Sequence, residues 1–350
     1  MTTMSGSPVR FGFLGAGGIA HSALAPAVHA ADGAVLHAGA ARDPQRVHSL
    51  EPAGPAYGDY NALLADDDVE VVYISLSNDL HAPWTLAALE AGKHVLCEKP
   101  LGLDAAQTRA MVDAAAAAGR MLVEAFWYRW HPRTRRLESL LAAGDLGELV
   151  GVDTEFSFRS DWTGTAATNY RLDPTKGGGG LYDVGCYAVS LVHTALDAAG
   201  RGGPLDVVAA EAVLGPTGVD VDATATLRPS GAGEQAPAAR LRCGISVHDL
   251  QAIAVTGTQG RAVFGAAGVA EREDPAFTSW HMPAFLTVHP AGGGEAVVER
   301  FEPVDPYRLM VEQLARAVRG QDAWLVPGSH SVAVAQTLDD VRAEAVGSDG

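Results

Sequence analysis

The sequence is poor in cysteine and in basic residues, and each shortage excludes a class of protein. Its 350 residues include only 3 cysteines, which are far apart and form no Cys-x-x-Cys pair, so we expect neither a disulfide framework nor a metal site. The 25 Lys and Arg residues are outnumbered by 42 Asp and Glu residues, which leaves a net charge of −17. The negative electrostatic field of such a chain repels phosphate backbones and anionic membranes, so we expect a small-molecule ligand and no nucleic-acid partner.

Charged residues and long apolar runs are also scarce. Only 19% of the residues are charged against 47% hydrophobic, which excludes disorder as the dominant state. One nearly uncharged stretch, residues 11–31, has features of a secretory signal, but its four glycines and Pro26 favour a turn. No other uncharged stretch reaches the ~20 residues that span a membrane. We therefore predict a soluble, cytoplasmic protein with reduced thiols.

The first third of the chain alternates short apolar segments with segments of helix length. We predict strands at residues 10–14, 34–41, 69–76, 94–97 and 121–126, separated by helices at 19–31, 44–50, 83–91 and 105–118. This alternation is typical of a parallel, doubly wound α/β sheet.

The pattern changes after about residue 130. We predict strands at 148–158, 207–213, 223–227, 239–247 and 252–256, with Gly- and Pro-rich breaks between them and closing helices at 307–318 and 331–345. Long strands with few helices favour an open, mostly antiparallel sheet. A chain of this length suits two domains, and we place them at 1–128 and 129–350.

A glycine motif follows the first predicted strand. Gly15-Ala16-Gly17-Gly18-Ile19-Ala20 fits G-x-G-x-x-(G/A), in which the glycines permit a tight turn and the helix N-terminus favours a pyrophosphate. We predict a dinucleotide-binding Rossmann domain in which Gly15, Gly17, Gly18 and Ile19 contact the cofactor. The alternative is a plain glycine turn.

The end of the second predicted strand bears on the choice of cofactor. A fingerprint for NAD has an acidic residue there, but this chain has Ala41 followed by Arg42. A guanidinium pairs well with a 2′-phosphate. We predict that Ala41 and Arg42 border the adenosine ribose and that the cofactor is NADP, with NAD left open. The alternative is a solvent-facing Arg42 at a helix start.

Two further polar segments follow predicted strands, Leu76-Ser-Asn-Asp-Leu-His81 and Glu98-Lys99-Pro100. Ligands of parallel sheets bind at the carboxyl ends of strands. We therefore expect cofactor contacts from Leu76, Asn78, His81, Glu98 and Lys99. For His81, a hydrogen-bonded turn is the alternative, whereas Lys99 between a buried strand and a proline is poorly placed for a solubilising charge.

The chain resembles the glucose–fructose oxidoreductase and inositol dehydrogenase family of NAD(P)-dependent enzymes over nearly its whole length. The resemblance rests on the glycine motif, Ser77–His81, Glu98–Pro100, Glu124–Pro132 and Gly178–Tyr187. The stretch Glu124–Pro132 is most similar to the branch of dimeric dihydrodiol dehydrogenases and NADP-dependent xylose dehydrogenases. The resemblance implies a Rossmann domain, an open-faced α/β domain and a nicotinamide bound between them.

The resemblance also implies catalytic residues. The family's catalytic lysine corresponds to Lys99, and an aspartate and an aromatic residue correspond to Asp183 and Tyr187. The last two are four residues apart in a predicted helix at 181–196, hence on one face. A tyrosine with a pKa near 10 needs a nearby cation to exchange a proton at neutral pH. We predict Tyr187 as the acid/base, Lys99 as that cation and Asp183 as an orienting group; the alternative is core packing of Tyr187 and a helix cap at Asp183.

The remaining candidates concern the substrate. We expect residues 127–129 to be extended, so that Trp127 and Arg129 share a face and Arg129 reaches the cofactor. Trp127, Trp162 and Arg171 are candidates for binding a sugar, with core packing the alternative for Trp162.

The predicted function is an NADP-dependent oxidoreductase that transfers a hydride between a nicotinamide and a sugar, polyol or vicinal diol. We predict that it acts as a homodimer formed through the exposed face of the second sheet, because the sequence offers few helices to cover that sheet. The alternatives are a catalytically silent NAD(P)-binding regulator and an NAD-using glycoside hydrolase.

Overall fold

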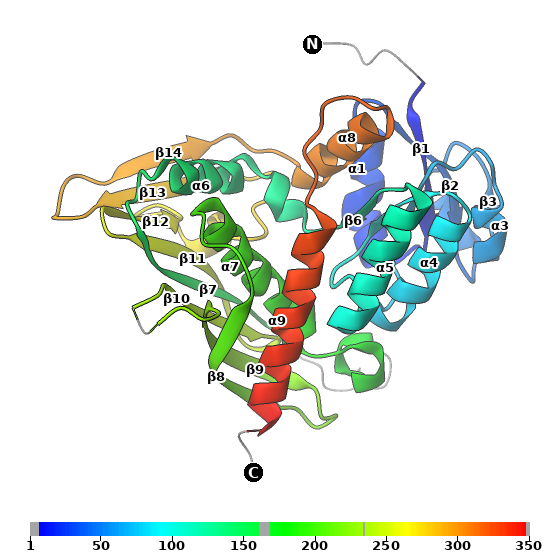
Figure 1. Cartoon of the computed structure of the whole chain (residues 1–350). Coiled ribbons are helices and arrows are strands. Elements are labelled where there is room, and N and C mark those ends of the chain that lie inside the picture. Colours follow the sequence, from blue (N-terminus) through cyan, green and yellow to red (C-terminus); the bar gives the residue numbers. More distant parts are fainter. Residues whose placement is uncertain (1–6, 161–168, 234, 348–350) are drawn as a thin grey trace. The chain divides into compact units, whose positions relative to one another are not determined.

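The computed structural model describes residues 7–160, 169–233 and 235–347, which form two compact units (Figure 1). Unit 1 comprises Met1–Trp130 and Asp305–Val332, and unit 2 comprises His131–Val304 and Ala333–Gly350. Each unit is described by itself.

Unit 1 is built on a six-stranded sheet with the order β3-β2-β1-β4-β5-β6, in which every pair of neighbours is parallel. The strands are β1 (Val9–Leu14), β2 (Ala34–Ala40), β3 (Ala56–Tyr57), β4 (Val71–Ile74), β5 (His94–Cys97) and β6 (Leu122–Glu124). This is the strand order of the Rossmann fold, and it confirms the predicted doubly wound sheet. The central strands are buried on both faces, which explains their continuous apolar sequences.

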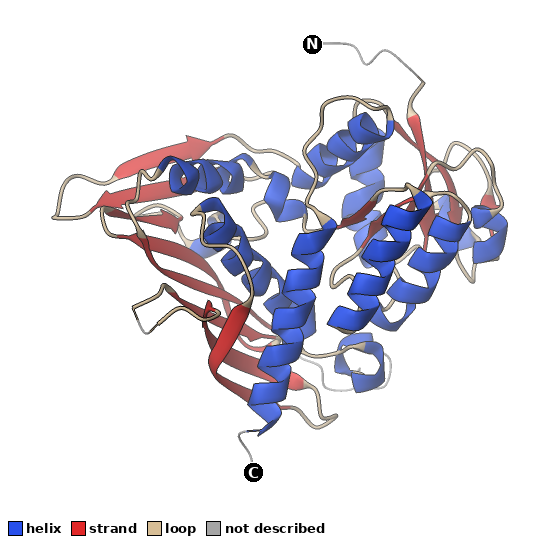
Figure 2. Cartoon of the chain, viewed as in Figure 1, coloured by secondary structure: helices blue, strands red, loops and turns tan. Residues whose placement is uncertain are grey.

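Helices lie on both sides of this sheet, as Figure 2 shows. They are η1 (Ala20–Leu24, a π-turn), α1 (Ala25–Ala30), α2 (Gln45–His48), α3 (Tyr60–Leu64), η2 (Asn78–Leu80), α4 (His81–Glu90), α5 (Ala105–Ala118), η3 (Trp127–Trp130) and α8 (Pro306–Val318). The element η3 corrects our expectation of an extended stretch at 127–129. It is a 3₁₀ turn in which all four side chains are buried, so side-chain alternation across a strand does not apply to Trp127 and Arg129.

The chain returns to unit 1 near its end, which differs from the predicted second domain at 129–350. Helix α8 buries Tyr307, Met310 and Leu314 in unit 1, and the Tyr307 ring stacks on Trp127 with centroids 5.0 Å apart. Just after α8, Arg319 Nη1 pairs with Glu70 Oε1 at 2.7 Å. The two residues of each of these contacts are about 180–250 positions apart in sequence, so the local hydrophobic periodicity of the sequence could not predict that they pair.

Unit 2 contains an eight-stranded sheet with the order β14-β13-β12-β11-β7-β10-β9-β8. The strands are β7 (Leu149–Arg159), β8 (Leu205–Leu214), β9 (Asp220–Pro229), β10 (Ala238–Gly244), β11 (Ser246–Gly257), β12 (Gly260–Phe264), β13 (Ala284–Pro290) and β14 (Val297–Phe301). Strands β7 and β10 are parallel and the other neighbours antiparallel, which confirms the predicted mostly antiparallel sheet. Sequence reasoning missed β12–β14, which are short and separated by Gly- and Pro-containing loops.

The helical segments of unit 2 include one long element that the sequence did not suggest. They are α6 (Pro132–Ala143), η4 (Tyr170–Leu172), η5 (Pro174–Lys176), η6 (Leu181–Gly185, a π-turn), α7 (Cys186–Ala198), η7 (Glu271–Glu273) and the unit 2 part of α9 (Gly328–Gly347). Helix α6 was missed, although His131 caps it by accepting a hydrogen bond from the Arg133 N–H and Pro132 suits its first turn. Figure 2 shows α6 and α7 against one face of the sheet.

Among the residues that the structure describes, no helix is both long and apolar enough to cross a membrane.

Candidate active site

In unit 1, the predicted cofactor residues gather at the carboxyl ends of β1, β2, β4 and β5. Strand β1 lies between β2 and β4, so the chain changes direction of winding there, and such switch points are where parallel sheets bind ligands. The glycine turn follows β1, Ala41 and Arg42 follow β2, residues 76–81 follow β4 and Glu98-Lys99-Pro100 follow β5.

The glycine turn has the shape that a pyrophosphate requires. Gly15 has φ +100°, and a Cβ there would lie 2.8 Å from the carbonyl oxygen of Ser75, so only glycine fits. By contrast, a Cβ on Gly17 would have its nearest neighbour at 3.9 Å, and one on Gly18 would have none within 4 Å. The backbone is therefore open at the start of the following helix, where Ile19 is half-buried. These residues fit a dinucleotide.

Two arginines stand near the end of β2. Arg42 is exposed and follows the buried, small Ala41, so the strand-end position at which an acid would select NAD carries none. Arg46 Nη2 donates to the carbonyl oxygen of Ala16 in the glycine turn at 2.6 Å. Burial raises the pKa of Tyr60, and the positive charges of Arg42 and Arg46 oppose that rise, so both guanidiniums lie near the same ring. Sequence reasoning missed Arg46; its spacing of one helical turn from Arg42 was the available signal.

Lys99 lies in a buried, acidic surrounding at the end of β5. It is half-buried and follows Glu98, whose Oε1 accepts a hydrogen bond from the Tyr73 hydroxyl at 2.8 Å. Burial raises the pKa of Glu98, while the ammonium of Lys99 and the Tyr73 hydrogen bond act to lower it. The positive charge of Lys99 therefore has a nearby negative partner that offsets the desolvation of both.

The segment after β4 is held by backbone contacts. Asn78 is buried at the start of η2, and Leu76 is half-buried. His81 is 0% exposed, with Nδ1 2.8 Å from the Pro100 carbonyl oxygen and Nε2 3.2 Å from that of Leu76. The imidazole thus connects the ends of β4 and β5, and its predicted contact with a cofactor stays a prediction.

Trp127 and Arg129 are both buried within unit 1. Trp127 stacks on Tyr307, and Arg129 Nη1 donates to His330 Nε2 at 3.2 Å while its guanidinium lies 5.5 Å from the Trp324 ring centroid. The roles predicted for them, substrate binding by Trp127 and cofactor contact by Arg129, stay predictions. Trp162 lies outside the residues that the structure describes.

In unit 2, Asp183 and Tyr187 occupy the start of the helix formed by η6 and α7. The first turn is a π-turn rather than the expected α-helical one, with Asp183 inside it and Tyr187 just after it. Asp183 is 8% exposed, and its Oδ2 accepts a hydrogen bond from Arg171 Nε at 2.8 Å. Arg171, predicted from sequence as a sugar-binding residue, is therefore the ion-pair partner of Asp183.

The Tyr187 ring is enclosed by aromatic side chains of unit 2. It is 5% exposed, with Phe156 and Phe277 centroids at 5.4 and 5.8 Å. Burial acts to lower the pKa of Arg171, but the charge of Asp183 and the nearby Tyr170 and Tyr187 raise it overall. Arg171 is thus a cation that acts on both Asp183 and Tyr187 from within the same unit.

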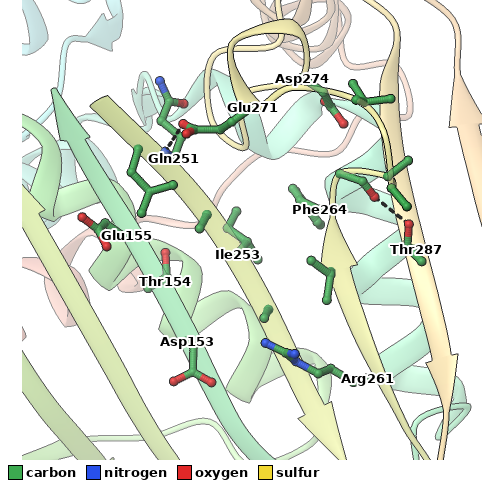
Figure 3. A pocket seen from close by; sticks show the side chains of 18 of the residues that line it. Asp153, Thr154, Glu155, Gln251, Ile253, Arg261, Phe264, Glu271, Asp274 and Thr287 are labelled. Carbon is green, nitrogen blue, oxygen red and sulfur yellow. Dashed lines mark hydrogen bonds between the residues drawn. The ribbon is translucent and has the colours of Figure 1, made fainter. Parts of the chain in front are cut away.

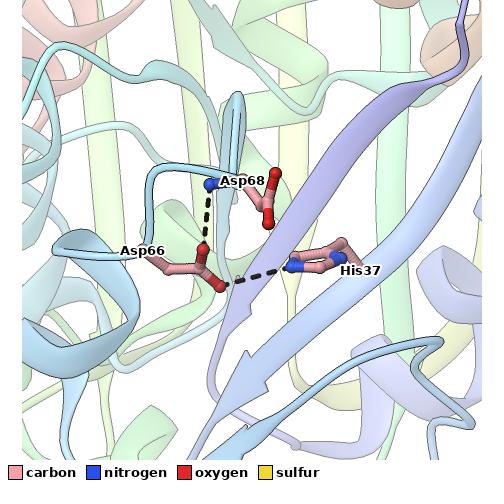
Figure 4. Close-up of side chains that lie close together, drawn as sticks. All are labelled: His37, Asp66 and Asp68. Atoms are coloured by element: carbon pink, nitrogen blue, oxygen red, sulfur yellow. Dashed lines mark hydrogen bonds and ion pairs between the residues drawn. The ribbon is translucent and has the colours of Figure 1, made fainter.

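A third polar cluster, in unit 1, is made by His37, Asp66 and Asp68 (Figure 4). Asp66 accepts hydrogen bonds from the Tyr57 hydroxyl at 3.1 Å and from the Asp68 N–H at 2.9 Å, and His37 Nε2 lies 3.3 Å from it. Asp68 has Arg10 at 3.7 Å. The cluster is explained by these contacts, and we assign it no metal.

Unit 1 has a parallel Rossmann-type sheet with a glycine turn and a strand-end lysine, and unit 2 has a mostly antiparallel sheet. This combination defines a class of nicotinamide-dependent oxidoreductases. Residues 9–126 match the oxidoreductase family with an NAD-binding Rossmann fold, and residues 134–263 match the GFO/IDH/MocA C-terminal domain. The chain belongs to the GFO/IDH/MocA oxidoreductase family.

Three proteins illustrate the similarity. A D-xylose 1-dehydrogenase (NADP⁺) of Haloferax volcanii is 40% identical over 337 residues, which are 95% of this chain and 96% of the relative. A trans-1,2-dihydrobenzene-1,2-diol dehydrogenase of Bos taurus is 35% identical over 59% of this chain and 58% of its own length. A 3-ketoreductase of Actinomadura kijaniata, solved with NADP and TDP-benzene, has a TM-score of 0.82 and 26% identity, covering 97% of this chain and 98% of the other.

Proposed function

We propose that the chain is an NADP-dependent dehydrogenase that transfers a hydride between the nicotinamide and a hydroxyl-bearing carbon of a sugar, polyol or vicinal diol. The observation that carries this function is the 40% identity, over 95% of the chain, to an NADP-dependent xylose dehydrogenase. The similarity to a diol dehydrogenase supports the same kind of substrate, a carbon chain with neighbouring oxygens.

The cofactor would be held by the strand-end residues of unit 1. The open backbone at Gly17 and Gly18 receives the pyrophosphate, Ala41 and Arg42 border the ribose that carries the 2′-phosphate, and residues 76–81 and 98–99 face the nicotinamide half. When bound, the nicotinamide supplies the acceptor or donor of the hydride.

The proton of the reacting hydroxyl is handled by residues of this chain. Tyr187 exchanges it as general acid/base, and Lys99 stabilises negative charge on the tyrosine and on the reacting oxygen. Asp183, which we expected to orient Lys99 or a hydroxyl, has Arg171 as its partner, and this ion pair fixes the carboxylate beside the start of α7.

A panel of aldoses, polyols and diols tests the function. The purified protein is mixed with each compound and with NADP or NAD, and reduction is followed at the nicotinamide absorbance. Turnover with sugars or diols supports the proposal. Cofactor binding without turnover of any compound indicates the silent regulator, whereas a cofactor retained through purification together with cleavage of glycosides indicates the hydrolase.

We expect Arg42→Asp to lose part of the preference for NADP over NAD. The wild type is expected to favour NADP, because the guanidinium pairs with the 2′-phosphate, and the carboxylate of the variant repels that phosphate while accepting a hydrogen bond from a free 2′-hydroxyl. The measurement is kcat/KM for NADP and NAD with the best substrate found. Equal or better use of NAD by the wild type would show that Arg42 does not select the cofactor.

A homodimer through the open face of the unit 2 sheet is the second part of the proposal. Side chains alternate between the two faces of a strand. Phe156 of β7 packs on Tyr187 of α7, and Glu155 and Asp153 are one and three residues away from it, so they lie on the face opposite the helix. That face carries a pocket of about 700 Å³ whose walls come from β7, β10, β11, β12, β13 and β14 (Figure 3). Its charges include the pair Asp153–Arg240, at 2.8 Å, beside apolar side chains such as Val263, which lies on the same face as Asp153.

The exposed apolar side chains support a second copy of this chain as the occupant. Apart from Leu86, the exposed large hydrophobic residues in the described part of the chain lie on strands of this sheet: Val150, Val208, Val213, Leu214, Val297 and Val298. Neighbours such as Val297 and Val298 point to opposite faces, and Val298 is the one of the six that lines the pocket. A face with both apolar groups and paired charges suits an isologous two-fold contact, in which the same patch meets itself.

Light scattering at micromolar concentration tests the dimer. The wild type is expected to have twice the mass of one chain. Val298→Asp, which puts a charge beside the pocket, is expected to raise the dimer dissociation constant. Leu86→Asp changes another exposed apolar site, on α4 of unit 1, and is expected to leave that constant unchanged. A wild-type monomer excludes the dimer.

We also propose a reducing, cytoplasmic location. The three cysteines, Cys97, Cys186 and Cys243, are buried and form no disulfide, and burial raises the pKa of the Cys97 and Cys243 thiols well above the usual value. A chain that keeps its cysteines as thiols fits a reducing compartment.

A further inference from the structure

The Pro100–Leu101 peptide group, which begins one residue after Lys99, is hydrogen-bonded at both ends by buried side chains. Its carbonyl, on Pro100, lies 2.8 Å from Nδ1 of His81, and its N–H, on Leu101, donates to Oε1 of Glu124 at 2.9 Å. His81 starts α4 and Glu124 ends β6, so the two contacts come from different elements of unit 1. Buried peptide groups are usually paired with other backbone groups, and two side-chain partners on one peptide are unusual.

The chemistry of each partner suits the atom that it faces. Burial lowers the pKa of His81, so its ring is neutral at pH 7 and has one N–H, which we assign to Nδ1 because its contact to an oxygen is the shorter. Glu124 is 3% exposed and presents a carboxyl oxygen to the Leu101 N–H. One donor and one acceptor therefore hold the two polar atoms of a single planar unit, and the plane of that unit cannot rotate without breaking a bond.

We propose that Glu124 is a positioning residue for Lys99, acting together with His81 by fixing the Pro100–Leu101 peptide group. This inference rests on the proposed function, in which Lys99 must meet a substrate oxygen. A lysine on a mobile loop would spread its ammonium over several positions, and a misplacement of 1 Å costs about 10²-fold in rate. The Pro100–Leu101 peptide group begins one residue after Lys99, so holding it limits the positions that the backbone of Lys99 can take.

The surroundings of Glu124 support a role beyond packing. Burial, with a smaller contribution from Glu98, raises the pKa of Glu124 to about 7, although hydrogen bonds from Ser331 and Leu101 and the charge of Lys99 act to lower it. A glutamine would accept the same hydrogen bond without this desolvation cost. Both the protonated and the ionised carboxyl offer an oxygen that accepts from the Leu101 N–H, so the positioning role depends on this hydrogen bond and not on the charge of Glu124.

Two variants of Glu124 separate the hydrogen bond from the rest of the side chain. Glu124→Leu removes the acceptor from the Leu101 N–H, and Glu124→Gln keeps a carbonyl oxygen in its place. We expect Glu124→Leu to lower kcat by about 10²-fold with little change in the NADP dissociation constant, and Glu124→Gln to restore kcat to within a few-fold of the wild type at the same pH. Glu70→Leu is the control, since it removes a carboxylate of unit 1 that pairs with Arg319 and precedes β4.

Amide hydrogen exchange in the full-length protein gives a readout that does not depend on activity. Exchange of the Leu101 amide is expected to be at least about tenfold faster in Glu124→Leu than in the wild type, and near the wild-type rate in Glu124→Gln and Glu70→Leu. If the wild type reduces no cofactor with any sugar or diol, the proposed function fails, and the exchange rates still decide whether Glu124 fixes the peptide.

The inference is overturned by any of three results. Exchange at Leu101 that is unchanged in Glu124→Leu means that the carboxyl does not hold the peptide. Faster exchange with unchanged kcat means that the peptide does not position Lys99. A loss of kcat in Glu70→Leu as large as in Glu124→Leu means that the effect is general destabilisation.

Discussion

Replacing Tyr187 by Phe is expected to lower kcat by about 10²–10⁴-fold while NADP binds nearly as in the wild type, because the change removes the proton-exchanging hydroxyl and no cofactor contact. Lys99→Met is expected to be comparably damaging. The double variant is expected to be little worse than either single one, since groups that act as a unit are strongly non-additive. Asp183→Asn is expected to be milder. Single-turnover rates and NADP titrations measure the two effects separately.

The control for this prediction is the neighbouring tyrosine. Tyr182→Phe makes the same chemical change one residue before Asp183, at a buried ring whose hydroxyl accepts a hydrogen bond from Arg342 at 3.2 Å. Its turnover is expected to stay near that of the wild type. If Tyr187→Phe also turns over normally, Tyr187 is not the acid/base, and Lys99 itself becomes the candidate.

The largest expected loss of stability follows from removing the buried guanidinium of Arg133. This side chain is 1% exposed and pairs with the carboxylate of Asp274, and Nη2 also donates to the carbonyl oxygens of Pro275 and Ala276, at 3.0 and 2.9 Å, and to Ser279 Oγ at 3.1 Å. Burial lowers the pKa of Arg133 to about 10, so the group is still charged at pH 7. Arg133→Met leaves a buried carboxylate without its cation.

We expect Arg133→Met to lower the free energy of unfolding by about 3–5 kcal/mol, the usual result of breaking a buried ion pair on one side. Arg136→Met, one turn along α6, removes a partly exposed pair with Glu299 and is expected to cost about 1 kcal/mol or less. Urea unfolding measures both, and Asp274→Asn added to Arg133→Met is expected to recover part of the loss. Equal losses in the Arg133 and Arg136 variants would contradict the prediction.

The same contacts connect stability to the candidate site. The loop held by Arg133 carries Phe277, which stacks on Phe156 with centroids 5.2 Å apart and lies beside Tyr187. When Arg133 no longer holds residues 275–279, one wall of the tyrosine's surroundings loses its support. We therefore interpret the buried pair as part of what fixes Tyr187, although it lies outside the residues assigned to catalysis.

The sequence by itself determined the features that depend on local spacing. Alternating apolar strands and helices predicted the parallel sheet, and Gly15, Gly17 and Gly18 marked the turn after β1 because their backbone requirements are local. The sequence also predicted that Lys99 follows a strand and that Asp183 and Tyr187 share one helical segment, because each of these placements depends on neighbours within a few residues.

Only the tertiary structure decided which distant side chains meet. The ion pair of Arg171 with Asp183, the packing of α8 in unit 1 and the two side chains on the Pro100–Leu101 peptide join residues between 12 and about 180 positions apart. The aromatic run at 127–130 became a 3₁₀ turn rather than a strand because its side chains are buried on several sides at once. Hydrophobic periodicity reports one buried face of one element, whereas these contacts depend on how several elements pack together.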